Sequence, residues 1–259
     1  MKRVVVISDL HSGSDVGLTP PDWQQDILQA ELWEVYAEMI EALRPIDVLI
    51  VNGDLIDGKA SRWGGTGLIT TDRHIQSDMA TEAIAFTDAT EIYLTYGTPY
   101  HTGRGEDWEA IVARNLGVPI EPQLWVNVNG VVFDAKHFTS ASSVPYGRHT
   151  TIARDRLWNI LWADMEQQPK SDIFIRSHVH YFNYCGGTNW VAMTTPALQG
   201  LGSKFGSRIP SGTVDFGLVY FDVYDDGSFS WDVDTILIET QKSQAYVVGE
   251  EDAEVSDES

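Results

Sequence analysis

The chain has 259 residues, of which 43% are hydrophobic and 11% aromatic, so it can form a packed core and lacks the composition of a disordered protein. The formal net charge is -21, with 17 Lys and Arg against 38 Asp and Glu, which disfavours a broad binding face for extended duplex nucleic acid. A single cysteine, Cys185, excludes an internal disulfide and a cysteine-based metal cluster. The single cysteine and the lack of any apolar run near 18 residues favour a cytoplasmic protein that does not bind membranes.

Strand and helix patterns alternate through the first part of the chain. Residues 3–9 (RVVVISD) predict a buried strand, and apolar residues at helical spacing follow it: Leu28, Leu32, Val35, Met39 and Leu43. We expect that helix to begin near Asp22 and to end at Pro45. The next predicted elements are a strand at 46–54, a polar glycine-rich loop at 58–77, a helix near 78–89, a strand at 91–96 and a helix at 106–116.

The second part is richer in strands. Asn129-Gly130 is a two-residue hairpin signal between two extended runs. A helix is predicted at 148–167, with Trp158 and Trp162 in the core, followed by strands at 172–176, 189–194, 217–224 and 229–238. Residues 1–240 should therefore form one α/β domain, with a mixed sheet or two packed sheets and helices outside. Residues 241–259 should form an acidic, disordered tail.

Acidic and histidine side chains follow the predicted strands in order. Asp9 and His11 follow the first strand, Asp54 the second and His101 the third. His137 ends the return strand of the hairpin, and the pair His178 and His180 follows strand 172–176. Because the carboxyl ends of strands meet at one edge of an α/β sheet, we expect these side chains to converge there. Carboxylate and imidazole ligands suit Mn, Fe, Zn, Ni or Co better than Ca.

This order of motifs (Asp-x-His, Gly-Asp-x-x-Asp, a Gly-led loop with His, a lone His, then His-x-His) resembles the calcineurin-like metallophosphoesterase superfamily. The resemblance covers residues 4 to about 195 and implies a four-layer αββα sandwich of two mixed β-sheets flanked by helices. It also implies two divalent metal ions. Asp9, His11 and His180 would hold the first, Asp54 would bridge both, and His137 and His178 would hold the second.

Such a site predicts hydrolysis of phosphomonoesters or phosphodiesters. Two cations about 3.5–4 Å apart offset the charge of a phosphate ester and lower the pKa of a bridging water, whose hydroxide then attacks phosphorus. Small nucleotides or nucleic-acid ends are the favoured substrates. The alternative is a non-catalytic scaffold that uses the same fold to bind partners, and the oligomeric state is not predicted.

The loop after the third strand departs from the family pattern. The family usually has Gly-Asn-His, whereas this chain has Gly97-Thr98-Pro99-Tyr100-His101, a variant similar to phage and prophage members. In one interpretation Thr98 is a weak metal ligand through its hydroxyl or carbonyl oxygen, and His101 protonates the leaving group. In the other, His101 itself binds the second metal, and the acid is unassigned.

Several further polar residues have two interpretations each. Asp57 is expected to support the ligands and not to bind metal. Arg148 and His149, at the start of a predicted helix, lie either on a solvated surface or near the site, where they would bind substrate phosphate. Lys204 and Arg208 lie in a Gly/Ser loop (200–212) that is either a surface loop or a substrate-side lid.

Overall fold

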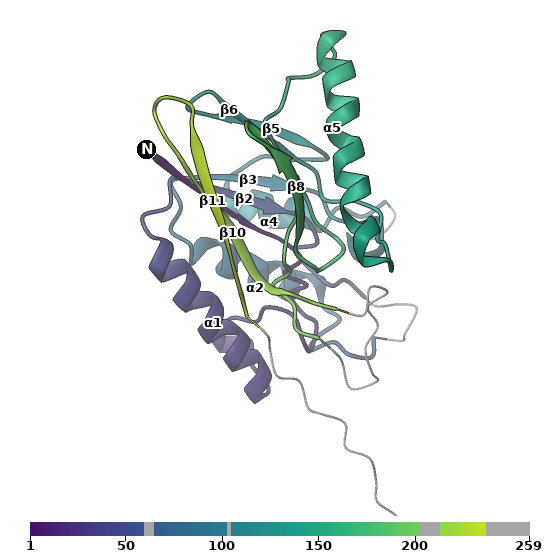
Figure 1. Ribbon diagram of the computed structural model, residues 1–259. Coiled ribbons are helices and arrows are strands. Elements are labelled where there is room, and N and C mark those ends of the chain that lie inside the picture. The colour runs from purple at the N-terminus through teal and green to yellow at the C-terminus, as the bar shows by residue number, and fades with distance from the viewer. Residues whose placement is uncertain (60–64, 103–104, 202–212, 237–259) are drawn as a thin grey trace, which may run out of the picture.

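The computed structural model describes residues 1–59, 65–102, 105–201 and 213–236, and Figure 1 shows how its elements are arranged. The first sheet contains β1 (Lys2–Ile7), β2 (Val48–Asn52), β3 (Glu91–Thr95), β4 (Ile120–Glu121), β10 (Phe216–Val223) and β11 (Phe229–Ile236). The second contains β5 (Leu124–Val128), β6 (Val131–Ala135), β7 (Ile173–Arg176), β8 (Asn183–Gly187) and β9 (Trp190–Thr194). The helices are α1 (Ile27–Leu43), α2 (Arg73–Ala85), α3 (Pro99–Thr102), α4 (Glu109–Leu116) and α5 (Arg148–Asp164), with short 3-10 turns at Pro21–Trp23 and Pro145–Gly147.

Both sheets are mixed, and helices cover their outer faces. The strand orders are β11-β10-β1-β2-β3-β4 and β5-β6-β7-β9-β8. Strands β1, β2, β3 and β4 run parallel, as do β6, β7 and β9. The pairs β1–β10, β10–β11, β5–β6 and β8–β9 are antiparallel. Helices α1, α2 and α4 pack on the first sheet, and α5 packs on the second. The fold is therefore the four-layer αββα sandwich that the sequence predicts.

The unbroken apolar run of strand β1 contributes to two hydrophobic cores, one on each face of the first sheet. Successive side chains of a strand point to opposite faces. Val4 and Val6 belong to the core between the sheets, whereas Val5 and Ile7 belong to the core beneath the helices. Because both faces of β1 are covered, the run VVVI shows no polar alternation, and all four residues are fully buried.

Most predicted elements are confirmed, and the differences have local causes. The hairpin at Asn129-Gly130 joins β5 to β6, with Val128 paired to Val131. Helix α1 begins later than predicted, because Asp26 and not Asp22 caps it by accepting a hydrogen bond from the amide of Gln29. Helix α2 begins at Arg73, inside the predicted loop 58–77. Strand β8 was not predicted, since its sequence NYCGG lacks an apolar run.

The prediction that Trp158 and Trp162 lie in the core is wrong. They are 48% and 47% exposed, because α5 turns this side away from the second sheet. The predicted tail (241–259) and the loop residues Lys204 and Arg208 lie outside the described residues.

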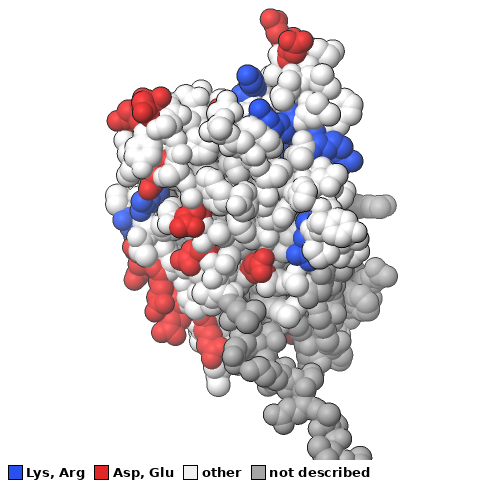
Figure 2. Space-filling model, in the orientation of Figure 1, with Lys and Arg blue, Asp and Glu red and all other residues white. Residues whose placement is uncertain are grey.

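The surface carries its charges unevenly. Figure 2 shows Asp and Glu gathered along α1 and Lys and Arg gathered along α5. Among the described helices, none combines the length and the apolar character needed to cross a membrane.

Candidate metal centre

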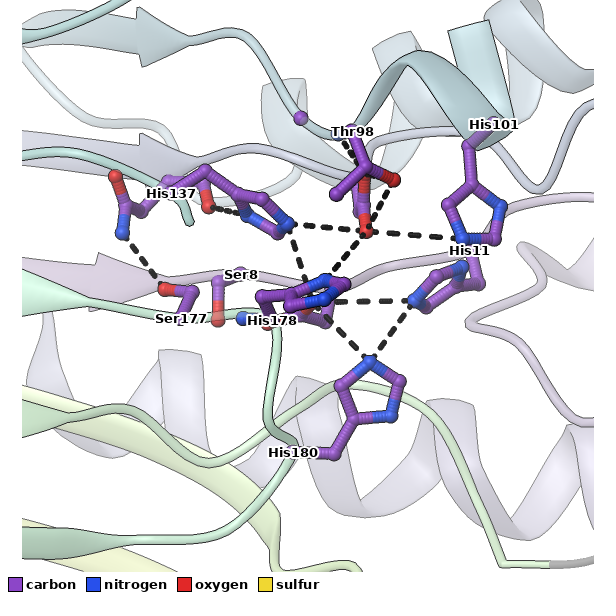
Figure 3. A network of polar contacts seen from close by, with 12 residues as sticks. Ser8, His11, Thr98, His101, His137, Ser177, His178 and His180 are labelled. Atoms are coloured by element: carbon purple, nitrogen blue, oxygen red, sulfur yellow. Dashed lines mark hydrogen bonds and ion pairs between the residues drawn. The ribbon is translucent and has the colours of Figure 1, made fainter. Parts of the chain in front are cut away.

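The predicted ligands meet where the strands of both sheets end. Asp9 and His11 follow β1, Asp54 follows β2, Thr98 and His101 follow β3, His137 follows β6, and His178 and His180 follow β7. Figure 3 shows the four imidazoles of His11, His137, His178 and His180 turned toward one centre. Five of these side chains are buried: Asp9, His11, Asp54, Thr98 and His137. The sequence-based prediction of convergence is confirmed.

Three side chains form a first group of potential ligands: Asp9, His11 and His180, whose nitrogen and oxygen atoms lie within 4.8 Å of one another. The Nε2 atom of His180 is 3.2 Å from Oδ1 of Asp9 and 3.2 Å from Nε2 of His11. One carboxylate and two imidazoles with this spacing are a donor set suited to a borderline divalent cation.

Asp54, His137 and His178 form a second group within the same distance limit. Nε2 of His137 lies 3.0 Å from Oδ2 of Asp54, and Nδ1 of His178 lies 3.9 Å from the same oxygen. Nε2 of His137 is also 4.0 Å from Oδ1 of Asp9, which joins the second group to the first. Asp54 recurs in a third group, with His11 and His101, so its carboxylate lies between the other side chains.

The backbone at this site is unusual. Asp9, His11, Asp54, His178 and His180 all have positive φ, between 45° and 74°. Residues with a Cβ adopt this left-handed region at a cost of about 1–2 kcal/mol each, so the surrounding fold must impose it. A turn immediately after each strand redirects the side chain toward the shared centre. No sequence pattern indicated this conformation.

Gly97 allows the closest approach at the site. A Cβ at this position would lie 2.1 Å from Oδ1 of Asp54 and 2.2 Å from its amide nitrogen. Any other residue would therefore displace the loop after β3 from the Asp54 carboxylate. The Gly-led loop noted in the sequence is required by this contact.

Hydrogen bonds orient two of the imidazoles. Nδ1 of His137 donates to the carbonyl of Asn52 at 2.7 Å, which leaves Nε2 as the atom that faces Asp54. Nδ1 of His11 lies 3.2 Å from Oδ1 of Asp57, which leaves Nε2 facing His180. Fixing one ring nitrogen in this way selects the tautomer whose other nitrogen can bind a cation.

Thr98 contacts the Asp54 carboxylate through both backbone and side chain. Its amide donates to Oδ1 of Asp54 at 2.6 Å, and its hydroxyl lies 3.2 and 3.4 Å from the two carboxylate oxygens. Figure 3 shows the Thr98 side chain directed at this carboxylate. A hydroxyl that donates to Asp54 can hold the carboxylate in its orientation, so these contacts are compatible with a positioning role for Thr98 as well as with the predicted weak ligand.

His101 lies beside both ligand groups. It is in α3, and its amide donates to the carbonyl of Thr98 at 3.1 Å. Nδ1 donates to the carbonyl of Asp57 at 3.0 Å, and Nε2 is 3.7 Å from Oδ2 of Asp54. Its ring contacts that of His11 edge-on, 4.5 Å between centroids. The side chain is 14% exposed, so Nε2 can reach a bound molecule.

Glu109 is a buried residue at the site that the sequence did not reveal. It comes from α4, and its two carboxylate oxygens accept from the amides of Leu55 (2.8 Å) and Gly97 (2.7 Å). These amides adjoin Asp54 and Thr98, so one side chain fixes the two turns that carry them. Burial, and then the Asp54 charge, raise the pKa of Glu109 to about 7.

A buried polar network joins the two sheets beneath the ligands. The amide of Asn52 donates to Oγ of Ser177 at 2.7 Å, and Thr95 donates to Oδ1 of Asn52 at 2.8 Å. Oγ of Thr195 lies 2.7 Å from the hydroxyls of both Ser8 and Ser177. Because Asn52 and Thr95 end β2 and β3, and the other three residues directly follow β1, β7 and β9, the network connects the strand ends of both sheets.

Opposite charges hold the side chains of Asp9, Asp54 and His137 in their charged forms. Burial disfavours the charged form of Asp9, but the attraction of His180 and His137 is stronger than this effect and lowers the pKa of Asp9 to about 2. The same balance, with His137 and His101 as the main partners, holds the pKa of Asp54 well below its usual range. Burial of His137 is outweighed by Asp54 and Asp9, which raise its pKa to about 10. The proton on His137 thus offsets part of the charge of the buried carboxylates.

The residues fit a metal ion, because several of their buried atoms have no hydrogen-bond partner among the described residues. These atoms are Oδ1 of Asp9, Nε2 of His137, Nδ1 of His178 and Nδ1 of His180. Buried polar atoms are normally satisfied. Of these unsatisfied atoms, Oδ1 of Asp9, Nε2 of His137 and Nδ1 of His178 face other candidate ligands, whereas His180 turns its Nε2 and not its Nδ1 toward Asp9 and His11. A divalent cation would satisfy the atoms that face this centre.

The two predicted substrate-binding residues within the described chain begin α5. The Arg148 guanidinium lies over the ring of Tyr181, 4.0 Å from its centroid, and Tyr181 directly follows the candidate ligand His180. His149 is exposed, and none of the described contacts joins its ring to the candidate ligands. Arg148 thus contacts a residue adjacent to a candidate ligand, while roles for Arg148 and His149 in substrate binding stay predictions.

Comparison of the sequence with models of known families shows which family the chain belongs to. The family model for calcineurin-like phosphoesterases matches residues 2–186. The chain belongs to this family. The match ends after the last candidate ligand, so it includes every strand end that contributes to the centre. No curated protein matches the chain.

Solved structures with a similar arrangement include other proteins of this fold. One is an archaeal protein described as a novel phosphodiesterase (11% identity, covering 89% of this chain and 99% of that one, TM-score 0.48). Another is wild-type Vps29 from Entamoeba histolytica complexed with zinc (13% identity, 90% and 98% covered, TM-score 0.45). A third is Vps29 from Chaetomium thermophilum (11% identity, 91% and 95% covered, TM-score 0.46).

Proposed function

We propose that the chain is a two-metal phosphoesterase, with Asp54 between the metals. Asp9, His11 and His180 hold the first cation, and His137 and His178 hold the second. The observation that carries this proposal is the presence of two adjacent ligand groups, each with one buried carboxylate, whose unsatisfied atoms include Oδ1 of Asp9 and Nε2 of His137, 4.0 Å apart. The ions are divalent, from Mn, Fe, Zn, Ni or Co.

Bound there, such cations supply Lewis-acid charge for a phosphate ester and lower the pKa of a coordinated water. Residues of the chain orient the candidate ligands and the candidate acid. Thr98 holds the Asp54 carboxylate in its orientation through two hydrogen bonds. Asp57 supports two histidines, since its carboxylate holds His11 and its carbonyl holds His101.

His101 is the candidate acid. Its Nδ1 is fixed by the carbonyl of Asp57, and its Nε2 faces the space beside Asp54. From there Nε2 can donate a proton to the departing oxygen of the substrate, a step that typically contributes about 10²–10⁴-fold to the rate. This assignment leaves Thr98 as a positioning residue and not a strong ligand.

The substrate is a phosphomonoester or phosphodiester, with small nucleotides or nucleic-acid ends preferred. The acidic surface disfavours long duplexes, because affinity for these depends on many Lys and Arg contacts to phosphates. Arg148, stacked on Tyr181 beside the centre, is the proposed phosphate contact, together with His149, Lys204 and Arg208. A cytoplasmic location is part of this proposal.

A second candidate function is a non-catalytic scaffold. The observation that favours it is the Thr98 hydroxyl, which donates to Asp54 where the family pattern supplies an amide ligand. A scaffold of this kind would bind metal weakly at the second group and would turn over no phosphate ester.

One experiment separates the two. The purified protein is assayed for bound metal, and then for hydrolysis of p-nitrophenyl phosphate and bis-p-nitrophenyl phosphate with Mn, Ni, Zn or Co. The variant Asp54→Asn should abolish turnover, whereas Asp88→Asn should not. This control makes the same chemical change at an exposed residue whose φ of 53° matches the 51° of Asp54. Weak binding of a second metal, together with absence of turnover with every metal added, would favour the scaffold.

A further inference from the structure

Helix α5 exposes a row of large apolar side chains. Trp158, Leu161 and Met165, spaced three and four residues apart, are 48%, 45% and 64% exposed. Three neighbours are exposed as well: Leu157, Ile160 and Trp162. We name these six residues the α5 face. The rings of Trp158 and Trp162 lie 6.1 Å apart, so the surface is continuous, and continuous apolar patches on a protein surface commonly mark an interface.

The α5 face takes no part in attaching the helix to the second sheet. In this fully described helix of 17 residues, the buried positions are Ile152 and Asn159. Asn159 accepts from the amide of Ser171 at 3.0 Å, and Asp155 accepts from Nε of Arg176 at 2.7 Å. These contacts fix α5 from its inner side. The apolar residues on the outer side are therefore open to contact by a partner.

We propose that the α5 faces of two copies of this chain pack against each other as an antiparallel, two-fold symmetric helix pair. The spacing of Trp158, Leu161 and Met165 is that of a helix-pairing seam. Arg154 lies toward the start of the seam, and Asp164 and Glu166 lie at its end. An antiparallel pair places each Arg154 beside the acidic end of the other copy. Figure 2 shows this separation, with Lys and Arg along α5 and Asp and Glu at its upper end.

The charge distribution favours α5 as the surface where two copies meet. The chain has a net charge of -21, so two copies repel each other over most of their surface. Residues 148–170 are different, with four Lys or Arg against three Asp or Glu. Close approach here costs no like-charge repulsion, whereas an approach through the acidic α1 side would.

The area of the α5 face is close to what a dimer needs. Six large side chains about half exposed offer on the order of 600 Å² of surface, compared with about 800 Å² from each partner in a standard interface. Because a two-fold axis uses the same patch on both copies, the α5 face needs no second, complementary surface.

The test is the mass of the full-length protein in solution. Sedimentation equilibrium from about 1 to 100 μM should give twice the monomer mass at the higher concentrations. Trp158→Glu and Leu161→Glu should each shift the dimer dissociation constant upward by at least tenfold. Ile27→Glu is the matched control, because Ile27 is an apolar helix residue that is 77% exposed and lies on α1, and it should leave the mass unchanged.

A charge exchange tests the antiparallel arrangement. Arg154→Glu alone should weaken the dimer, and adding Glu166→Arg in the same chain should restore it. Circular dichroism of each variant checks that the helix content is kept. A wild-type monomer at 100 μM, or a dimer that tolerates both Trp158→Glu and Leu161→Glu, would overturn the proposal and assign the α5 face to a different protein. Failure of the charge exchange to restore the dimer would overturn the antiparallel pairing.

Discussion

The amide nitrogen of Thr98 lies 2.6 Å from Oδ1 of Asp54, and the Thr98 hydroxyl lies 3.2 Å from the same oxygen. One residue thus makes two contacts to the carboxylate that lies between the two ligand groups. The backbone contact is independent of the side chain, but the hydroxyl contact is not. A threonine at this position can therefore orient Asp54 without being a ligand.

Replacing Thr98 by valine tests this role. Thr98→Val keeps the shape and the amide but loses the hydroxyl hydrogen bond, which is worth about 1.5 kcal/mol when the acceptor is charged. We expect kcat/KM to fall roughly tenfold and metal stoichiometry to stay the same. Thr87→Val, which removes the buried hydroxyl that donates to Ile84, should leave kcat/KM unchanged. If Thr98→Val loses one equivalent of metal, Thr98 is a ligand.

The order of residues after each strand was enough to predict that these side chains converge, whereas their roles as ligands came from the family resemblance and stay a prediction. Asp9, Asp54 and His178 each follow a buried strand, and parallel strand ends must meet at one edge. The prediction needed no knowledge of distances. It depended on recognising strands, which the unbroken apolar runs made clear.

Other features of the site depend on backbone conformation and on contacts between distant elements. The positive φ of His11 and His180 leaves no pattern in the sequence. Glu109 lies on α4 and accepts a hydrogen bond from the amide of Gly97, 12 residues earlier in the chain. Because it does not follow a strand, the pattern of strand ends did not reveal it. The exposure of Trp162 was missed because apolar spacing predicts a helix but not which of its sides is covered.

Replacing His101 by glutamine separates its two interpretations. If His101 is the acid, His101→Gln should lower kcat about 10²–10⁴-fold for an alkyl phosphate, whose leaving group needs a proton. The loss should be much smaller for a p-nitrophenyl ester, whose leaving group does not. Metal content, measured by elemental analysis, should stay the same.

The control is His74→Gln, which changes a histidine that lies on α2 against Trp108, and it should alter neither rate. Equal losses for both esters together with loss of metal would make His101 a ligand and leave the acid unassigned.

Metal binding should release a proton from His137. Asp54 and Asp9 outweigh burial and raise the pKa of this imidazole to about 10, so at pH 8 the ring is protonated in the metal-free protein. A cation binds the neutral ring. Affinity for the second cation should therefore rise as the pH increases toward 10, up to about tenfold for each pH unit.

Calorimetry in two buffers with different ionisation enthalpies gives the number of protons released. The variant His137→Gln should release one proton fewer per protein at pH 8. An affinity that is constant between pH 7 and 9 would contradict the prediction.

Glu109 should make the metal-free protein less stable as the pH rises. Burial and the charge of Asp54 raise the pKa of its carboxyl from the ordinary 4.5 to about 7 in the folded state. A group with a raised folded pKa stabilises the fold fully below its unfolded pKa and loses that contribution as the pH passes its folded pKa. Between pH 4.5 and 8 this carboxyl should therefore cost on the order of 3 kcal/mol of stability.

The measurement is urea unfolding of the chelator-treated protein at several pH values. Glu109→Gln cannot ionise, so its free energy of unfolding should lack this component of the pH dependence, even though it loses one of the two acceptors for the amides of Leu55 and Gly97. The difference between the wild type and Glu109→Gln should thus change with pH, in favour of the variant above pH 7. Parallel pH profiles for the two proteins would show that Glu109 keeps an ordinary pKa in its buried position.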